Sequence, residues 1–339
     1  MKPFQFTFRS NFVFLAAILA SAAFASHSRC ESLATFANRG VNSVAPCSPC
    51  EQSCSNCCCD NARVEVMVGT IFLDRSSPRR RPLLEDTGAD VWFTDDFDLG
   101  NAAGPEISIL LHRNKCWAFG VRHVSADGWD ALRNRVAPAP QLVPEFDGVS
   151  GPFQESTVSY GSELYSTEFN VYRRRNDDCT IFAGFRMVEL HERTIYRGFD
   201  PAPLDSRMDL KANNHLYGGQ LGLNQTLLSS SNGLELDLTM AAGIYGSSQK
   251  SRRRMTGDFT VPLGEFNEEG HYTSFVGELG LRGFVPLTRR IDLYGGYNLI
   301  WIDNVSLSMN QIPFNTGNQP NWRDQVFYHG ATVGLRLTF

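Results

Sequence analysis

The feature that most constrains this chain is an alternation of apolar and polar residues that runs through most of its length. From Arg63 to Phe339, ten segments change polarity at every second residue. That period belongs to β-strands, whose successive side chains point to opposite faces, and it differs from the period of helices. The predicted strands are 63–74, 105–112, 116–124, 155–173, 179–193, 208–226, 234–247, 272–286, 290–304 and 325–339. The sequence therefore predicts an all-β fold.

The connections between these strands are alternately long and short. The long ones are 75–104, 125–154, 194–207, 248–271 and 305–324, and the short ones are 113–115, 174–178, 227–233 and 287–289. Transmembrane β-barrels have short turns at one end and longer loops at the other. We therefore predict a closed up-and-down antiparallel transmembrane β-barrel of about ten strands, with twelve as the alternative. A soluble sandwich or barrel would give no reason for the alternation of loop lengths.

The predicted strands are long, and the last one ends on an aromatic residue. Many reach the roughly 9–11 residues that a tilted strand needs to cross a bilayer. Phe339 follows apolar residues placed two, four and six positions earlier. That ending resembles the C-terminal signature that the barrel-assembly machinery reads in bacterial outer-membrane proteins. The sequence thus predicts Phe339 as the assembly signal, with the lipid bilayer and the assembly machinery as partners.

The polar faces of the predicted strands are expected to line the lumen, because the apolar faces point to lipid. The residues predicted there are Glu168, Arg186, Glu235, Asp237, Glu278, Arg282, Asp292 and Arg336. In a barrel of about ten strands the bore is narrow, so long charged side chains pair across it. Two interpretations stay open: a narrow porin-like channel, and a closed, salt-bridged structural protein of the cell surface. Aromatic residues near strand ends are expected at the membrane interfaces, namely Tyr172, Tyr245, Tyr272, Trp301 and Phe327.

Two N-terminal segments precede the predicted barrel of residues 63–339. Lys2 and Arg9 come before an apolar run that ends in Ala-Phe-Ala, which is typical of a secretory signal peptide, here 1–25. Residues 26–62 are rich in Cys, Ser, Asn and Pro, and we expect them to form a largely irregular leader. The sequence therefore predicts export, and the barrel predicts the bacterial outer membrane as the destination.

Six of the nine cysteines lie close together in this leader. They are Cys47, Cys50, Cys54, Cys57, Cys58 and Cys59. Thiols this dense oxidise in an exported protein, which favours disulfides or a disulfide-linked partner. The C-x2-C-x3-C-x2-C spacing is also compatible with a metal or iron–sulfur site. We favour crosslinking because the segment has almost no apolar periodicity, and we expect no metal or other cofactor.

Charge and motifs argue against two other classes of protein. A net charge of −5 is unfavourable for nucleic-acid binding. An outer-membrane protease or lipase needs a His/Asp or Ser/His constellation near the outer rim. The candidates are Asp95, Asp96, Asp98, His191, Asp200, Asp205 and His271. The sequence has no nucleophile elbow, zinc-protease motif or phosphate loop, so we expect no catalysis. An outer-membrane enzyme and a soluble exported β-barrel binding protein are the alternatives.

Several short motifs carry a family resemblance. The Cys-rich leader runs into VEVMVG at 64–69, LGNAAGP at 99–105 precedes a hairpin, and SELY at 162–165 opens a strand that continues as EFNVYRR. Together these motifs resemble the large planctomycete family of outer-membrane β-barrel porins, across the whole predicted barrel. The resemblance implies a barrel with a porin or surface role, and it supplies no catalytic residues to carry over.

Overall fold

The computed structural model of this protein describes most of the chain from residue 63 onward. The described residues are 63–339 except 115, 147–150, 202–203, 258–263 and 313–322. The predicted signal peptide and cysteine-rich leader lie outside them. Within the described part of the chain, no helix is long and apolar enough to cross a membrane.

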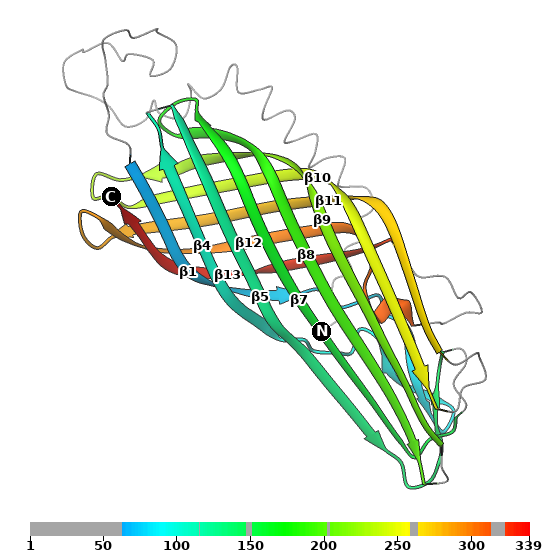
Figure 1. The fold of residues 1–339 in the computed structure, drawn as a ribbon. Helices are drawn as coiled ribbons and strands as arrows, with labels where there is room; N and C mark the ends of the chain where they lie inside the picture. The colour runs from blue at the N-terminus through cyan, green and yellow to red at the C-terminus, as the bar shows by residue number, and fades with distance from the viewer. Residues whose placement is uncertain (1–62, 115, 147–150, 202–203, 258–263, 313–322) are drawn as a thin grey trace, which may run out of the picture. The chain divides into compact units, whose positions relative to one another are not determined.

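The described residues form a closed barrel of ten antiparallel strands (Figure 1). The barrel strands are β1 (Arg63–Arg75), β4 (Asn101–His112), β5 (Trp117–Val136), β7 (Glu155–Arg174), β8 (Cys179–Asp200), β9 (Leu204–Ser229), β10 (Glu235–Thr256), β11 (Gly264–Pro286), β12 (Ile291–Val305) and β13 (Asp324–Thr338). Consecutive barrel strands are neighbours, and β13 closes the barrel against β1, with Thr338 opposite Glu65. The prediction of an up-and-down barrel of about ten strands is confirmed.

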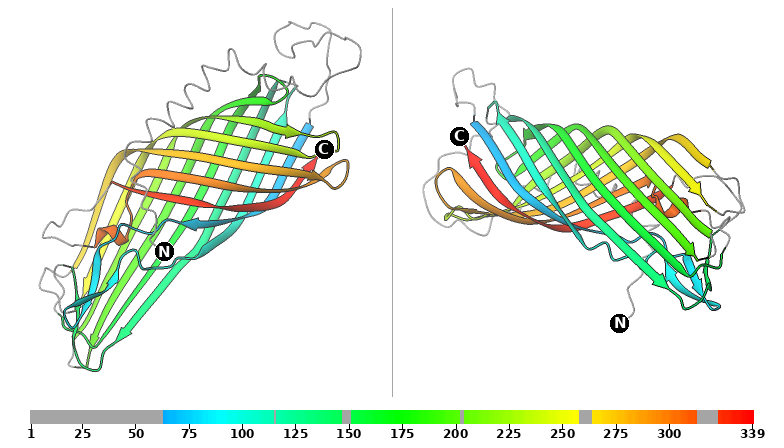
Figure 2. Two further views of the ribbon diagram at one scale, coloured as in Figure 1. Left: turned by 180° about the vertical axis from the view of Figure 1, so that it is seen from behind. Right: turned by 60° about the horizontal axis from the view of Figure 1, so that its bottom comes forward.

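Tight turns join the strands at one end of the barrel, which we call the short-turn end. The turns span 113–116, 175–178, 230–234 and 287–290. β1 begins and β13 ends at this same end (Figure 2). Both termini of the barrel therefore lie on the short-turn side, as an even number of up-and-down strands requires.

The connections at the opposite, long-loop end differ from the prediction. Two of them contain a separate small sheet in the order β3-β2-β6, made of β2 (Pro82–Asp86), β3 (Ala89–Phe93) and β6 (Leu142–Pro144). The predicted long connections 194–207 and 248–271 are mostly strand, so that only 201–203 and 257–263 join the strands there. The prediction ended these strands too early because apolar residues stop recurring on their outward faces while the pairing continues.

The two faces of the strands exchange polarity part of the way along the barrel. On β8 nearer the short-turn end, Ile181 and Phe185 face outward and are exposed, whereas Arg186 faces inward and is buried. Nearer the long-loop end, the outward side chain of Arg193 is charged and the inward side chain of Leu190 is fully buried. This change of polarity is expected if lipid covers the outer wall near the short-turn end and water covers it near the long-loop end.

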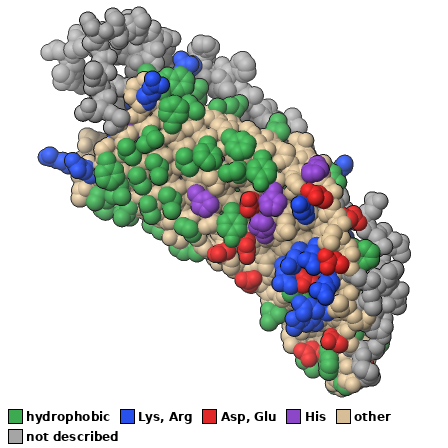
Figure 3. All heavy atoms as spheres, in the orientation of Figure 1, with side chains coloured by type: hydrophobic (Ala, Val, Ile, Leu, Met, Phe, Trp, Pro, Cys, Tyr) green, Lys and Arg blue, Asp and Glu red, His purple; other side chains and the backbone are tan. Residues whose placement is uncertain are grey.

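We call the exposed, outward-facing apolar residues near the short-turn end the apolar band. It includes Val68, Phe72, Ile107, Ile109, Leu111, Phe119, Val121, Phe169, Val171, Ile181, Phe185, Tyr217, Leu221, Ile244, Leu279, Leu281, Leu293, Tyr297, Val333 and Leu335. On β10 the outward apolar positions run from Leu236 to Ile244, which matches the roughly 9–11 residues of a membrane strand. On the face that Figure 3 draws, hydrophobic side chains cover one half of the wall and most of the charged side chains gather over the other.

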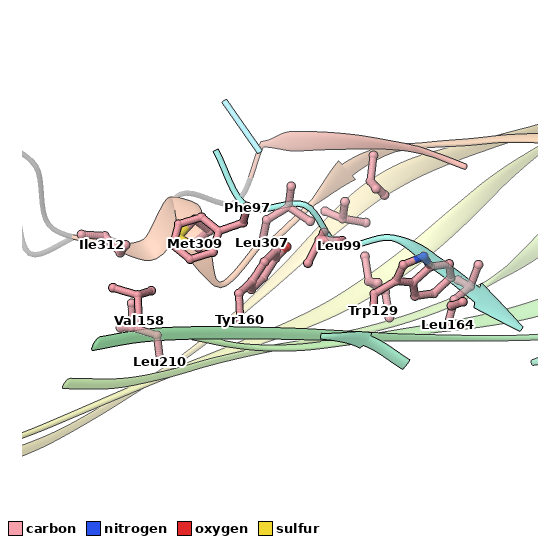
Figure 4. Close-up of a cluster of buried hydrophobic side chains, with 14 of the residues drawn as sticks. Phe97, Leu99, Trp129, Val158, Tyr160, Leu164, Leu210, Leu307, Met309 and Ile312 are labelled. Atoms are coloured by element: carbon pink, nitrogen blue, oxygen red, sulfur yellow. The ribbon is translucent and has the colours of Figure 1, made fainter. Parts of the chain in front are cut away.

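The interior beyond the apolar band is a hydrophobic core. Trp129 and Tyr160 of the wall strands are buried there. Phe97 from the connection after β3 and Met309 from the short 3-10 helix η2 (Met309–Gln311) pack against them inside the barrel (Figure 4). The loops of the long-loop end thus fill the barrel from within, in the manner of the core of a soluble protein.

Three of the five aromatic residues predicted at the membrane interfaces face inward. Tyr245 is buried and donates a hydrogen bond to Gln220, 3.3 Å away. Tyr172 lines the lumen, and Tyr272 pairs with the buried Ser247. Only Trp301 and Phe327 face outward, since their chain neighbours are buried. The aromatic prediction was wrong because these tyrosines sit at strand positions of the opposite parity.

Candidate functional site: the barrel lumen

A layer of paired charges crosses the lumen at the level of the apolar band. We call it the charge layer, and its members are Glu106, Arg122, Glu168, Arg186, Glu278 and Arg282. Arg122 donates hydrogen bonds to Glu106 at 2.8 Å and to Glu278 at 2.6 Å. Arg186 reaches the other oxygen of Glu278 at 2.7 Å. Three guanidinium groups and three carboxylates thus neutralise one another.

Neutral polar side chains satisfy the remaining oxygen atoms of the charge layer. The hydroxyl of Thr332 donates to Glu106 at 2.7 Å, and the amide of Gln220 donates to Glu168 at 2.7 Å. Asn170 donates to the same oxygen of Glu168 at 3.1 Å. Buried charges are tolerated where both the opposite charge and such hydrogen bonds are present. The layer is therefore a complete polar network rather than a row of unpaired charges.

Glycines of the inner wall leave room for the large side chains in the bore. A Cβ built on Gly184 would collide with Asn170, and one built on Gly218 would lie 2.8 Å from Cδ1 of Tyr245. Gly218 is also the strand partner of Arg186. The glycines therefore allow the arginine and tyrosine side chains to lie across the narrow bore, where larger residues would displace them.

A polar cavity lies between the charge layer and the short-turn end. Its volume is about 710 Å³, and its lining extends from Arg122 and Glu278 to the turn residue Asp178. Inside it, Arg336 donates to Asp292 at 2.7 Å and to Glu235 at 3.1 Å. The charge layer thus forms the inner wall of a vestibule at the short-turn end.

A single ion pair is buried in the hydrophobic core on the other side of the charge layer. Arg75 contacts Glu192, and both side chains are completely buried. The backbone amide of Ser308 donates to the second oxygen of Glu192 at 2.8 Å, which ties the connection after β12 to the wall. From the vestibule outward, the bore is therefore occupied first by paired charges and then by apolar side chains around one ion pair.

The structure places all eight predicted lumen residues on the inner wall. They are Glu168, Arg186, Glu235, Asp237, Glu278, Arg282, Asp292 and Arg336. Four of them belong to the charge layer, and Glu235, Asp292 and Arg336 form the second group of paired charges. Asp237 lines the vestibule. The strand pairing therefore brings residues from distant strands into two groups at different depths.

Sequence reasoning missed two members of the charge layer, Glu106 and Arg122. Glu106 lies between the outward residues Pro105 and Ile107 in the segment PEISILL, and Arg122 follows the outward residues Phe119 and Val121 in the segment FGVRH. The alternation that identified the other members could have identified these two as well. What the sequence could not supply is that Arg122 is the residue that contacts all three carboxylates.

The residues considered for catalysis lie in separate parts of the molecule. Asp95 pairs with Arg80 at 3.0 Å in the loops of the long-loop end. His191 faces outward on β8 and bonds Asn213 at 3.0 Å. The remaining candidates are Asp96 and Asp98 beside Asp95, Asp200 and Asp205 at the β8–β9 tip, and the outward-facing His271 of β11. Among the residues that the structure describes, no group of three His, Cys, Asp or Glu side chains is placed to hold a metal ion.

Phe339 follows the last strand and pairs with the first. Its amide donates to the carbonyl of Val64 at 2.9 Å and its carbonyl accepts from Val64 at 3.2 Å, while the ring is exposed. Thr338 faces the lumen, where its hydroxyl accepts from Arg63. The role of Phe339 in assembly stays a prediction. The six clustered cysteines lie outside the described residues.

The fold is similar to solved outer-membrane barrels at low sequence identity. One is the outer membrane protease OmpT of Escherichia coli, with 14% identity over 83% of this chain and 97% of that one, and a TM-score of 0.44. Another is the translocator domain of the autotransporter NalP of Neisseria meningitidis, with 9% identity, coverage of 82% and 89%, and a TM-score of 0.40. The toluene transporter TbuX of Ralstonia pickettii has 9% identity, the same coverage and a TM-score of 0.33. No family model and no curated protein sequence matches this chain.

Proposed function

We propose that this protein is an outer-membrane β-barrel with a sealed lumen, which acts as a structural or interaction protein of the cell surface. The proposal rests on the observation that side chains fill the bore at two successive levels. The charge layer spans it at the level of the apolar band, and the hydrophobic core fills it beyond. Ions crossing this lumen would have to displace both paired charges and packed apolar side chains.

The exterior of the barrel supports residence in a membrane. A closed barrel pairs the backbone groups of every strand, as lipid requires, and the apolar band supplies a lipid-facing surface. In bacterial outer-membrane barrels the long loops face the outside of the cell. The vestibule would then open toward the periplasm, and the extended strands β7–β11 would project from the surface.

We propose no catalytic activity, because the candidate residues are engaged in separate contacts of the wall and loops. The proposal includes membership of the planctomycete family of barrels, on the motifs quoted above. The crosslinking role of Cys47, Cys50, Cys54, Cys57, Cys58 and Cys59 belongs to the same proposal, since a sealed barrel anchors whatever its leader binds.

Planar-bilayer conductance of the refolded protein tests whether the lumen is sealed. We expect no stable current steps from the wild type. The double variant Arg122→Ala, Glu278→Ala opens only the charge layer. The double variant Phe97→Ala, Met309→Ala loosens only the hydrophobic core. Neither pair alone should produce steps, whereas the four substitutions together should produce small ones.

The matched control for this experiment is Arg113→Ala with Asp178→Ala, a neutral pair of changes at the short turns. It should behave as the wild type does. Wild-type current steps as large as those of a general porin would overturn the proposal. Steps from the charge-layer pair alone would show that the core does not close the bore.

A further inference from the structure

The outward face of β8, β9 and β10 beyond the apolar band is rich in cations. We call this surface the basic wall, and its cations are Arg193, Arg197, Arg207, Lys211, Lys250, Arg252 and Arg254. Figure 3 shows Lys and Arg side chains gathered on this face, with Asp and Glu side chains among them, past the apolar side chains and the histidines. The sequence suggested a loop here, but Arg252 and Arg254 belong to β10 and face outward.

Strand pairing places several of these cations directly beside one another. Lys211 of β9 is the partner of both Arg193 on β8 and Arg252 on β10, so three cations form one row across three strands. In the same way Arg197 is the partner of Arg207. Like charges at directly paired positions destabilise a sheet. A bound anion would relieve whatever part of this repulsion the protein's own carboxylates leave.

Carboxylates of the protein neutralise only part of the basic wall. Asp209 bonds Arg193 at 2.5 Å and lies 3.7 Å from Arg207. Glu265 and Glu269 of β11 pair with Arg252 at 2.7 Å and Lys250 at 3.6 Å.

Asp205 also faces outward on β9, two residues from Arg207, so seven cations and four carboxylates leave a charge of +3 on this surface (7 − 4). Arg197, Lys211 and Arg254 form no salt bridge with any residue that the structure describes. Lys211 and Arg254 act on Asp209 and Glu265 only through space, without a direct contact, so the guanidinium and ammonium groups of all three can still contact an external anion.

The height of the wall above the apolar band restricts the kind of anion that fits. Lys211 lies six residues beyond Tyr217, the last outward apolar residue of β9. Six residues of a tilted strand correspond to about 15 Å along the barrel axis. Lipid phosphates lie only a few ångströms above the hydrocarbon, whereas phosphorylated sugars of a glycolipid extend farther into the water.

We propose that the basic wall binds the phosphorylated sugars of an outer-leaflet glycolipid of the lipopolysaccharide type. The lipid chains would lie against the apolar band, and the sugar phosphates would contact Arg197, Lys211 and Arg254. Each part of the amphiphile thereby meets a surface of matching polarity on the same strands. The inference rests on the outer-membrane residence proposed above.

Binding of rough lipopolysaccharide to the full-length protein in detergent tests this proposal. The wild type should bind it, and the triple variant Arg197→Gln, Lys211→Gln, Arg254→Gln should bind at least about tenfold more weakly, because each surface cation contributes to anion attraction. The same lipid after chemical removal of its phosphates should bind the wild type as weakly as the triple variant binds the intact lipid. Inorganic phosphate should not compete.

The matched control is Arg113→Gln, Arg175→Gln, Arg289→Gln, which removes three exposed cations from the short-turn end and should leave binding unchanged. The difference in gel mobility between boiled and unboiled samples shows whether each variant folds. Should the triple variant fail to fold, Lys211→Gln alone is expected to weaken binding about fivefold.

Several results would overturn the proposal: equal binding by the triple variant and the wild type, an equal loss in the control, or equal binding of phosphatidylglycerol. Competition by inorganic phosphate would assign the wall to the free ion instead. Membrane residence is measured separately, by resistance to alkaline carbonate extraction from cell membranes. A protein that resists extraction but does not bind the glycolipid refutes this inference alone.

Discussion

The short-turn half and the long-loop half of the barrel place the same kinds of residue on opposite sides of the wall. In the short-turn half Leu221 faces outward and Gln220 is buried inside. In the long-loop half Leu210 is buried inside and Lys211 faces outward. All four residues belong to β9, so neither strand geometry nor local propensity explains the difference.

The comparison teaches that the surroundings of each face decide its residues. Where lipid covers the outside, apolar side chains are favourable there, and the polar ones must satisfy one another in the bore. Where water covers the outside, the ordinary preference for a hydrophobic interior returns. The level at which β8 and β9 exchange polarity therefore marks the proposed outer boundary of the membrane.

The largest expected effect compares the buried charges of the two halves. Glu192→Gln leaves Arg75 without its carboxylate in a hydrophobic core, which should lower the free energy of unfolding by about 3–5 kcal/mol. Glu278→Gln should cost less, about 1.5–3 kcal/mol, because Arg122 keeps Glu106 and Glu168. Urea unfolding of the refolded protein in detergent micelles, followed by tryptophan fluorescence, measures both values. If both substitutions lowered the free energy of unfolding equally, the remaining carboxylates of the charge layer would not compensate for the loss of Glu278.

A smaller effect is expected when two single variants are compared, each with an arginine introduced at a different level of the outward face of β9. Leu221→Arg puts a charge into the apolar band, where it should cost about 2–4 kcal/mol if the site lies near the bilayer midplane. Asn213→Arg lies on the same face of β9 beyond the band, opposite Lys250, and should cost no more than about 1 kcal/mol. Refolding equilibria in lipid vesicles measure the two. Similar costs would place the membrane boundary elsewhere.

The smallest expected effect concerns an ion pair on the outer surface of the long-loop half. Burial raises the pKa of Asp209, but the hydrogen bonds and charge of Arg193 outweigh it and hold the pKa below its usual range. A lowered pKa means that this carboxylate stabilises the fold above the unfolded pKa and loses the effect as the pH falls through the folded pKa.

Asp209→Asn should therefore lower the free energy of unfolding at pH 7 by no more than about 1 kcal/mol. The difference from the wild type should disappear as the pH falls below the ordinary carboxyl pKa of 3.8. Urea unfolding at a series of pH values measures it. If the stability difference between wild type and Asp209→Asn grew toward low pH, the pKa of Asp209 could not be lowered by Arg193.

The positions of the strands and the inner face of the short-turn half could be predicted from the sequence. The alternation alone identified Glu168, Arg186 and Glu278 as inward-facing. The apolar residues of each strand occupy the face toward lipid, so the residues between them must face the lumen. The same logic ended β8 and β10 too early, since it treated apolar outward residues as the mark of a strand. Tyr245 shares the inward face of β10 with Glu235 and Asp237, so the same alternation places it in the bore, against the prediction of a membrane-interface position.

The sequence by itself determined an all-β fold, since residues that alternate in polarity over ten segments form strands, and the alternating loop lengths indicated a closed up-and-down barrel. The tertiary structure alone decided that the bore is filled. Glu106 and Arg122 are diagonal neighbours on the paired strands β4 and β5. Glu278 lies on β11, and only closure of the barrel brings it within hydrogen-bonding distance of Arg122. Polarity along a strand records which residues share a face, but contact across a bore depends on register, strand number and the loops that fold inside.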